Sequence, residues 1–205
     1  MTLTSLKAYG LVCTLTGSPE PSSTQLLADQ VLAELAEYGA ETSTDRTVDH
    51  DVAPGVSADE GPGDGWPRIR SRIHSSDILV LATPTWMGHA SSEAQRVLER
   101  LDAELSVTDD EGRAVIAGKV AIVAIVGNED GAHAIVADLY QGLADVGFTI
   151  PSQGATYWNG EAMHTVDYRD LGQTPDKVAA TTRTAAANAY HLARVLREHP
   201  YLPPR

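Results

Sequence analysis

Hydroxyl side chains crowd one short segment near the start of the chain. Residues 14–25 read Thr-Leu-Thr-Gly-Ser-Pro-Glu-Pro-Ser-Ser-Thr-Gln, after an apolar run and before an amphipathic one. Hydroxyls and free backbone N–H groups at the start of a helix can bind a phosphate, although the same residue types also serve as ordinary helix caps. The candidate phosphate-binding residues are Thr16, Ser18, Ser22, Ser23, Thr24 and Gln25.

Two further loops carry residues suited to a flat aromatic ring. Residues 83–88 (Thr-Pro-Thr-Trp-Met-Gly) directly follow an apolar run, and residues 127–131 (Gly-Asn-Glu-Asp-Gly) follow another. Trp86 offers an apolar wall for such a ring. Glycines let backbone groups approach a ligand closely, and here they are Gly88, Gly127 and Gly131. Residues 14–25 suit a phosphate, and residues 83–88 and 127–131, which we call the ring loops, suit a flat ring. Together they match a mononucleotide with a flat ring.

The sequence lacks the residues that several other kinds of binding or catalytic site require. Neither Gly-x-x-x-x-Gly-Lys nor Gly-x-Gly-x-x-Gly occurs, so neither a P-loop nor a Rossmann phosphate site is indicated. Cys13 ends an apolar run, but Pro19 stands where a cysteine-dependent phosphatase needs arginine. The seven histidines show no metal-ligand spacing, and no Ser-His-Asp or carboxylate pair stands out. We therefore expect no metal site and no catalytic acid–base residue.

The length and composition limit the classes of protein to which the chain can belong. The 205 residues suit one domain, 1–205, with a full hydrophobic core. The net charge of −13 argues against nucleic acid and membrane surfaces as partners, because such binding depends on Lys and Arg. The single cysteine excludes a disulfide framework, the apolar run 120–126 is too short to span a bilayer, and residues 1–6 do not resemble a signal peptide. These features predict a cytoplasmic protein.

Strand and helix patterns alternate along the chain. Continuous apolar runs predict buried strands, a polar run predicts an edge strand, and apolar residues at helical spacing predict helices. The expected strands cover 7–13, 41–48, 77–82, 119–127 and a last one that starts at 148–151; the expected helices cover 24–38, a short stretch from 66, 91–105, 132–146 and 174–199. The acidic segment 49–65 is expected to be a solvated loop.

Five such repeats predict an α/β domain, with a five-stranded parallel sheet between two layers of helices. The polar run 41–48 belongs at an edge and the apolar runs at 7–13, 77–82 and 119–127 in the centre, which gives the strand order 2-1-3-4-5. In this order the loops after strands one, three and four meet at the carboxyl edge of the sheet. Ligands of such sheets bind at that edge.

Several segments together resemble the NADPH-dependent FMN reductase family of the flavodoxin-like superfamily, over nearly the whole chain. They are Gly17-Ser18-Pro19 with Ser23-Thr24, the 83–88 segment, Arg100-Leu101-Asp102, residues 127–132 and residues 157–161. The resemblance implies a flavodoxin-like three-layer fold and bound FMN, whose phosphate the first segment would hold. The isoalloxazine would be held by residues from the next two loops, namely Pro84, Thr85, Trp86, Met87, Gly88, Gly127, Asn128, Glu129, Asp130 and Gly131.

The chain departs from the family pattern at two positions. Glu20 stands where relatives often have a basic residue, so the phosphate is expected to depend on neutral donors. Met87 stands where relatives commonly have an aromatic residue, and its thioether can pack on a ring.

The resemblance implies an NAD(P)H-dependent FMN reductase, similar to quinone reductases. Hydride would pass from NAD(P)H to bound FMN, and electrons would then go to a small-molecule acceptor such as a quinone or free flavin. Tyr157 and Trp158 would lie near the mouth of the site, and His133 follows a cofactor loop; these three are the candidate substrate contacts. A homodimer that includes the helix after Ser91 is also implied. The alternatives are a flavodoxin-type electron carrier without NAD(P)H oxidase activity and a flavin-free interaction domain of the same fold.

Overall fold

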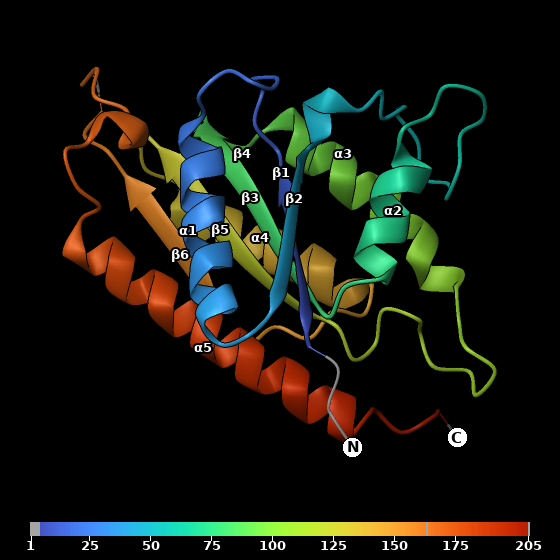
Figure 1. The fold of residues 1–205 in the computed structure, drawn as a ribbon. Helices are drawn as coiled ribbons and strands as arrows, with labels where there is room; N and C mark the ends of the chain where they lie inside the picture. Colours follow the sequence, from blue (N-terminus) through green and yellow to red (C-terminus); the bar gives the residue numbers. More distant parts are fainter. Residues whose placement is uncertain (1–4, 163, 205) are drawn as a thin grey trace.

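Five parallel strands form a sheet between two layers of helices (Figure 1). The computed structural model describes residues 5–162 and 164–204. In chain order the elements are β1 (Lys7–Val12), α1 (Ser23–Glu37), β2 (Glu41–Arg46), the 3₁₀ turn Thr47–Asp49, α2 (Trp66–His74), β3 (Ile78–Trp86), β4 (His89–Ala90), α3 (Ser92–Leu101), the 3₁₀ turn Asp102–Ser106, β5 (Val120–Gly127), α4 (Ala132–Asp145), β6 (Ala155–Asn159), the 3₁₀ turn Tyr168–Asp170 and α5 (Asp176–Glu198). Within the described residues, no helix has both the length and the apolar character needed to cross a membrane.

The sheet has the strand order β2-β1-β3-β5-β6, and all its neighbouring pairs are parallel. Counted along the parallel strands alone, this is the order 2-1-3-4-5, which confirms the prediction. The register pairs Val12 of β1 with Ala82 of β3, and Ala82 with Ala124 of β5. These three residues therefore lie level with one another near the carboxyl edge of the sheet, where β1 ends while β3 and β5 continue to Trp86 and Gly127.

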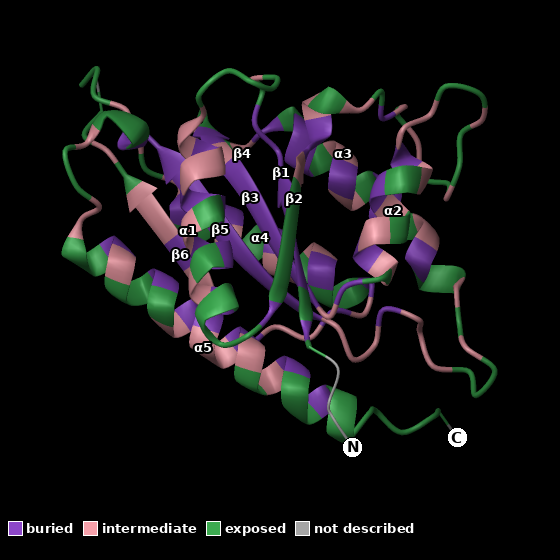
Figure 2. Cartoon of the chain, viewed as in Figure 1, coloured by how far each residue is buried: buried purple, intermediate pink, exposed green. Residues whose placement is uncertain are grey.

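Alternate residues of the central strands pack into two separate hydrophobic cores. In β5 the even-numbered residues from Val120 to Val126 face the core that α1 and α5 cover, and the odd-numbered residues from Ala121 to Ile125 face the core under α2, α3 and α4. Figure 2 shows the central strands buried between the helices, whose outward faces are exposed. A strand buried on both faces needs apolar residues at every position, which explains its continuous apolar sequence.

β3 runs well past the end expected at Ala82, because it continues through a proline. The Ala82 carbonyl accepts a hydrogen bond from Cys13 N at 2.7 Å, so Pro84, two residues further on, also turns its backbone toward β1. β1 has already ended at Val12, and the missing N–H of proline therefore breaks no ladder bond. The strand keeps pairing with β5 on its other side, where Pro84 lies opposite Val126.

A tight hairpin, which the sequence did not predict, joins β3 to the antiparallel β4. Met87 and Gly88 form its turn, and both have positive φ angles, 54° and 77°, as a type I′ turn requires. This conformation suits glycine and strains a methionine. Trp86 is 55% exposed and Met87 86% exposed, so two large apolar side chains stand at the carboxyl edge of the sheet.

The last strand lies later in the chain than expected. Residues 148–151 contribute only a single bridge, from Thr149 to Val120. The chain then turns, with Gly154 N donating to the carbonyl of Pro151, and regular pairing with β5 resumes at Ala155. Residues 157–159 are therefore part of the edge strand β6.

Ser91 joins the ends of three elements beneath the β3–β4 hairpin. Its Oγ donates to the carbonyl of Cys13 at 2.6 Å and accepts from Ala94 N at 3.2 Å, which caps α3 as the sequence predicted. Its own N–H donates to Thr83 Oγ1 at 3.0 Å. Ser91 is only 2% exposed, so this one side chain fixes the start of α3 to the ends of β1 and β3.

A buried arginine anchors the acidic segment 49–65, so the expectation of a simply solvated loop was incomplete. Arg100 of α3, fully buried, donates to Asp64 Oδ2 at 2.7 Å and to the carbonyls of Ala53 and Ser57 at 2.8 and 2.9 Å. Burial raises the pKa of the Asp64 carboxyl, but hydrogen bonds from Arg100 and from backbone N–H groups outweigh it and hold the pKa well below its usual range. The segment is thereby fixed against α3.

Replacing Ser91 by alanine is expected to lower the free energy of unfolding by about 2 kcal/mol, because the change removes a helix cap and leaves a buried carbonyl without its donor. Urea unfolding followed by circular dichroism measures the loss. Ser92→Ala, at the exposed neighbouring position, is the matched control and should change the stability by less than about 0.5 kcal/mol. Equal losses in the two variants would contradict the role given to Ser91.

Candidate functional site

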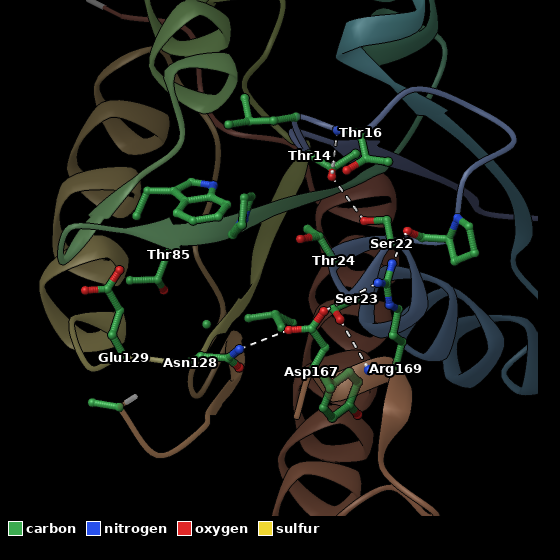
Figure 3. Close-up of a pocket in the computed structure, with 18 residues that line it drawn as sticks. Thr14, Thr16, Ser22, Ser23, Thr24, Thr85, Asn128, Glu129, Asp167 and Arg169 are labelled. Atoms are coloured by element: carbon green, nitrogen blue, oxygen red, sulfur yellow. Dashed lines mark hydrogen bonds and ion pairs between the residues drawn. The ribbon is translucent and has the colours of Figure 1, made fainter. Parts of the chain in front are cut away.

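A cavity of about 530 Å³ opens at the carboxyl edge of the sheet, at the ends of β1, β3 and β5. Cavities of this size commonly hold small ligands and cofactors. The three loops that the sequence predicted to converge form part of its wall, and the segment between β6 and α5 completes it (Figure 3). The lining residues are Thr14, Leu15, Thr16, Pro21, Ser22, Ser23, Thr24, Pro84, Thr85, Trp86, Val126, Gly127, Asn128, Glu129, Ala162, Asp167, Tyr168 and Arg169.

The amino end of α1 forms one end of the cavity. Ser22 caps this helix: its Oγ accepts from Gln25 N at 3.3 Å and donates to Thr14 Oγ1 at 3.1 Å. Thr14 Oγ1 also accepts from Thr16 N at 3.2 Å, which folds the loop back on itself. The first turn of α1 carries no acidic residue. Its free N–H groups and the positive end of the helix dipole therefore favour an anion there.

Thr85 lies across the cavity from these hydroxyls (Figure 3). The residue is 4% exposed, and its Oγ1 has no hydrogen-bond partner in the described structure. A buried hydroxyl without a partner costs free energy, so its presence in a cavity wall points to a partner supplied by a ligand. Gly127 makes room for it, because a Cβ there would come within 2.6 Å of Thr85 Cβ.

The β3–β4 turn and the loop after β5 are held together at the edge of the cavity. Glu129 Oε1 accepts from Met87 N at 2.8 Å. Gly131 lies against Gly88 so closely that a Cβ there would meet the Gly88 carbonyl oxygen at 2.7 Å. The two glycines thus let the two loops touch, and Trp86 remains half-exposed beside them.

The segment between β6 and α5 supplies a wall that the sequence motifs did not reveal. Asn128 Nδ2 donates to Asp167 Oδ1 at 2.9 Å, and Arg169 lies beside the amino end of α1, where its backbone N–H donates to Ser23 Oγ at 3.2 Å. The structure thus adds a cationic residue to the neutral donors expected at the phosphate end, since Arg169 lines the cavity there. No local signal marks Arg169, because only the tertiary fold brings residue 169 next to residue 23.

Two residues predicted to bind the phosphate are engaged elsewhere and lie outside the cavity lining. Ser18 donates through its N–H and its Oγ to the carboxylate of Asp49, at 2.8 and 2.6 Å, and these bonds lower the pKa of Asp49. Gln25 accepts from Arg46 Nε at 3.1 Å and donates to Asp29 at 2.8 Å. Both side chains support the loop that carries the lining hydroxyls.

Of the other predicted residues, some line the cavity and some do not. Four members of the two ring loops lie outside the lining: Met87, Gly88, Asp130 and Gly131. Met87 and Gly88 form the turn, Gly131 contacts Gly88, and Asp130 is exposed. His133 Nε2 and the Tyr157 hydroxyl are hydrogen-bonded to each other at 2.9 Å, and Trp158 packs against Tyr168 with ring centroids 5.5 Å apart. None of these three predicted substrate contacts lines the cavity. Those predicted residues that do line it are Thr16, Ser22, Ser23, Thr24, Pro84, Thr85, Trp86, Gly127, Asn128 and Glu129.

The donors and walls of the cavity fit a flavin mononucleotide. The amino end of α1 with its hydroxyls and Arg169 suits the phosphate, and Trp86 with the unpartnered Thr85 hydroxyl suits a ring that is apolar on its face and polar at its edge. Among the described residues, no group of three or more His, Cys, Asp or Glu side chains is placed to hold a metal ion. Burial raises the pKa of the Cys13 thiol, which keeps it protonated.

Comparison with known proteins agrees with this geometry. The model of the family described as NADPH-dependent FMN reductase matches residues 11–162. The 8-demethyl-8-aminoriboflavin-5'-phosphate synthase of Streptomyces davaonensis is 34% identical over 206 residues, which covers 96% of this chain and 80% of that protein. A Mycobacterium bovis protein described as the divalent metal cation transporter MntH is 35% identical over 199 residues. The match covers 94% of this chain but only 29% of the length of that protein.

Solved structures extend the likeness. The crystal structure of RosB with bound 8-demethyl-8-formylriboflavin-5'-phosphate superposes with a TM-score of 0.87 at 33% identity, covering 96% of this chain and 82% of that one. Flavodoxin structures at 8–16% identity share the fold alone. The flavodoxin-like fold expected from the sequence is thus confirmed.

Thr85→Val is expected to leave the free energy of unfolding within about 1 kcal/mol of the wild-type value, since the hydroxyl has no protein partner to lose. The same change should weaken FMN binding about threefold to tenfold, because the cofactor loses one hydrogen bond. Flavin fluorescence titration and urea unfolding measure the two effects.

Gly127→Ala provides the steric counterpart. The added methyl group would collide with the Thr85 side chain, so both the stability and FMN affinity should fall. Gly172→Ala is the matched control, because nothing lies within 4 Å of a Cβ at that position. A Thr85→Val variant that loses stability but binds FMN normally would refute the assignment of this hydroxyl to the cofactor.

Proposed function

Because the chain belongs to the family of NADPH-dependent FMN reductases, we propose that it oxidises NAD(P)H and passes the electrons through bound FMN to a small-molecule acceptor. The chain is a flavoprotein oxidoreductase that binds FMN. The acceptor would be a quinone or free flavin. The observation that carries the proposal is a cavity with an anion-binding helix start at one end and the Trp86 face with the unpartnered Thr85 hydroxyl at the other.

Each group of lining residues has a distinct part in this function. Ser22, Ser23 and Thr24 would hold the phosphate with the free N–H groups of α1, while Thr85, Gly127 and Asn128 would face the polar edge of the ring. When bound, FMN supplies the chemistry by accepting a hydride and giving electrons up again. No side chain has to act as a general acid or base in hydride transfer, which agrees with the lack of a catalytic acid–base residue in the sequence prediction.

The exposed side of the site would receive the nicotinamide and then the acceptor. Trp86 is half-exposed at the rim, and the neighbouring Met87 is more exposed still. The His133–Tyr157 pair begins two residues after Gly131, which touches the β3–β4 turn, so these side chains stay candidate substrate contacts, together with Trp158. A homodimer that uses the face of α3, a cytoplasmic location and the absence of nucleic-acid partners also belong to the proposal.

A second candidate function follows from the relatives that cover most of both chains. The synthase from S. davaonensis and the RosB structure are 33–34% identical to this chain, whereas the NADH:FMN oxidoreductase structure EmoB is 16% identical. Both of these relatives are described with flavins altered at ring position 8. In this alternative, the flavin held in the cavity would be the substrate and not a resident cofactor.

Anaerobic mixing of the FMN-loaded protein with NADPH, and separately with NADH, tests the proposal. The visible absorbance of the flavin should disappear at a rate that accounts for turnover, and it should return when a quinone or free FMN is added. A separate aerobic incubation of the FMN-loaded protein with an amino-group donor, followed by mass spectrometry of the recovered flavin, checks the second candidate, because replacing the 8-methyl group by an amino group needs both an oxidant and a source of nitrogen. Unaltered FMN that NAD(P)H reduces fits the reductase, and a flavin of changed mass fits the synthase. Flavin that is neither reduced nor altered would contradict both and leave an electron carrier.

A further inference from the structure

Arg169 brings a positive charge to the phosphate end of the cavity from a part of the chain remote from the hydroxyl loop. Its Nη1 donates to the carbonyl of Pro21 at 2.5 Å and its backbone N–H to Ser23 Oγ at 3.2 Å (Figure 3). Ser22 and Ser23 line the cavity together with it. The Arg169 guanidinium thus connects Pro21, the residue before the helix cap Ser22, to the segment between β6 and α5.

The segment that carries Arg169 is fixed on both sides of it. Tyr168 is 2% exposed, and its hydroxyl donates to Gln30 Oε1 of α1 at 2.6 Å. Gln30 Nε2 in turn donates to Thr174 Oγ1 at 2.8 Å, and Asp167 accepts from Asn128 of the loop after β5. The position of Arg169 is therefore set by the fold, before any ligand arrives.

The surroundings of Arg169 make its charge necessary for holding an anion. Asp167 and Asp170 lie 3.5 and 3.8 Å from its guanidinium, and Glu20 precedes Pro21 in the loop. Among the residues that line the cavity, Arg169 is the only cation. The nearby Arg46 does not line the cavity, and its Nη1 donates to the carbonyls of Thr16 and Glu20 at 3.1 and 2.7 Å. Without Arg169, a phosphate at the start of α1 would therefore meet neutral donors and these carboxylates within the cavity. A guanidinium is suited to such a site because its fork of N–H donors matches phosphate oxygens.

Pro21 and Arg169, whose hydrogen bond forms a bridge, line both the cavity and a second, open hollow, whose other lining residues are Thr16, Glu20 and Asp170. We infer that Arg169 recognises the terminal phosphate monoester of the flavin, and that its bridge to Pro21 closes the path along which the adenylate half of FAD would have to pass. Arg169 is then the residue that selects FMN over both riboflavin and FAD. This inference rests on the FMN binding of the proposed function and not on its NAD(P)H chemistry.

Titration of the flavin-free, full-length protein with riboflavin, FMN and FAD tests the inference, with quenching of flavin fluorescence as the readout. Arg169→Gln should weaken FMN binding about 10- to 100-fold, because a charge-assisted contact is lost. Riboflavin has no phosphate, and its affinity should change less than about twofold. In Arg169→Gln the ratio of FMN affinity to FAD affinity should also become smaller. Arg169→Lys keeps the charge but not the fork of N–H donors, so its FMN affinity should lie between those of Arg169→Gln and the wild type.

Arg194→Gln is the matched control. It removes the same charge near the end of α5, beside Ser5 and Leu6 at the amino edge of the sheet, and should leave all three affinities unchanged. Equal weakening of riboflavin and FMN by Arg169→Gln would overturn the inference, since Arg169 would then only shape the cavity. Unchanged FMN affinity, or wild-type binding of FAD as tight as FMN, would overturn it as well. Failure of the wild type to bind any flavin would instead refute the proposed function.

Discussion

The site depends on the parallel pairing of β3 between β1 and β5. Parallel strands in register end at one edge, and here Val12, Ala82 and Ala124 lie side by side just before that edge. Three groups of lining residues, 14–16, 84–86 and 126–129, follow within a few residues of this level, and residues 21–24, 162 and 167–169 complete the cavity. Because both faces of these strands are buried, a slip in register would disrupt both hydrophobic cores at once. The packing of the sheet therefore fixes the distance between the helix start and the ring wall.

Two residues at this edge, Thr85 and Met87, are in locally unfavourable environments. Thr85 carries a buried hydroxyl without a partner, and Met87 occupies a turn position that suits glycine. Both features cost stability in the protein alone. They lie in or beside one cavity, where a ligand or partner can compensate for them, whereas Ser91 and Arg100 nearby have their hydrogen bonds made. The pattern separates residues that build the edge from residues that serve what binds there.

Local sequence was enough to predict the central strands, the order of the parallel strands and the three loops that meet at the carboxyl edge. Continuous apolar runs identified the central strands, and the cap residues Ser22 and Ser91 marked where helices begin. What escaped prediction depends on contacts remote in the chain. Pro84 looked like a strand end, yet β1 stops early enough for the proline to pair on one side only. Arg169 could not be assigned from its neighbours, since its place beside Ser23 arises only when β6 and α5 pack against the sheet.

A crystal structure of the protein grown with FMN would test most directly whether this cavity is the cofactor site. The phosphate should lie within hydrogen-bonding distance of the hydroxyls and N–H groups at the start of α1, beside Arg169. The ring should lie against Trp86, and the Thr85 hydroxyl should have gained a partner. Flavin bound at another place on the protein, or a cavity that stays empty at saturating FMN, would contradict the assignment.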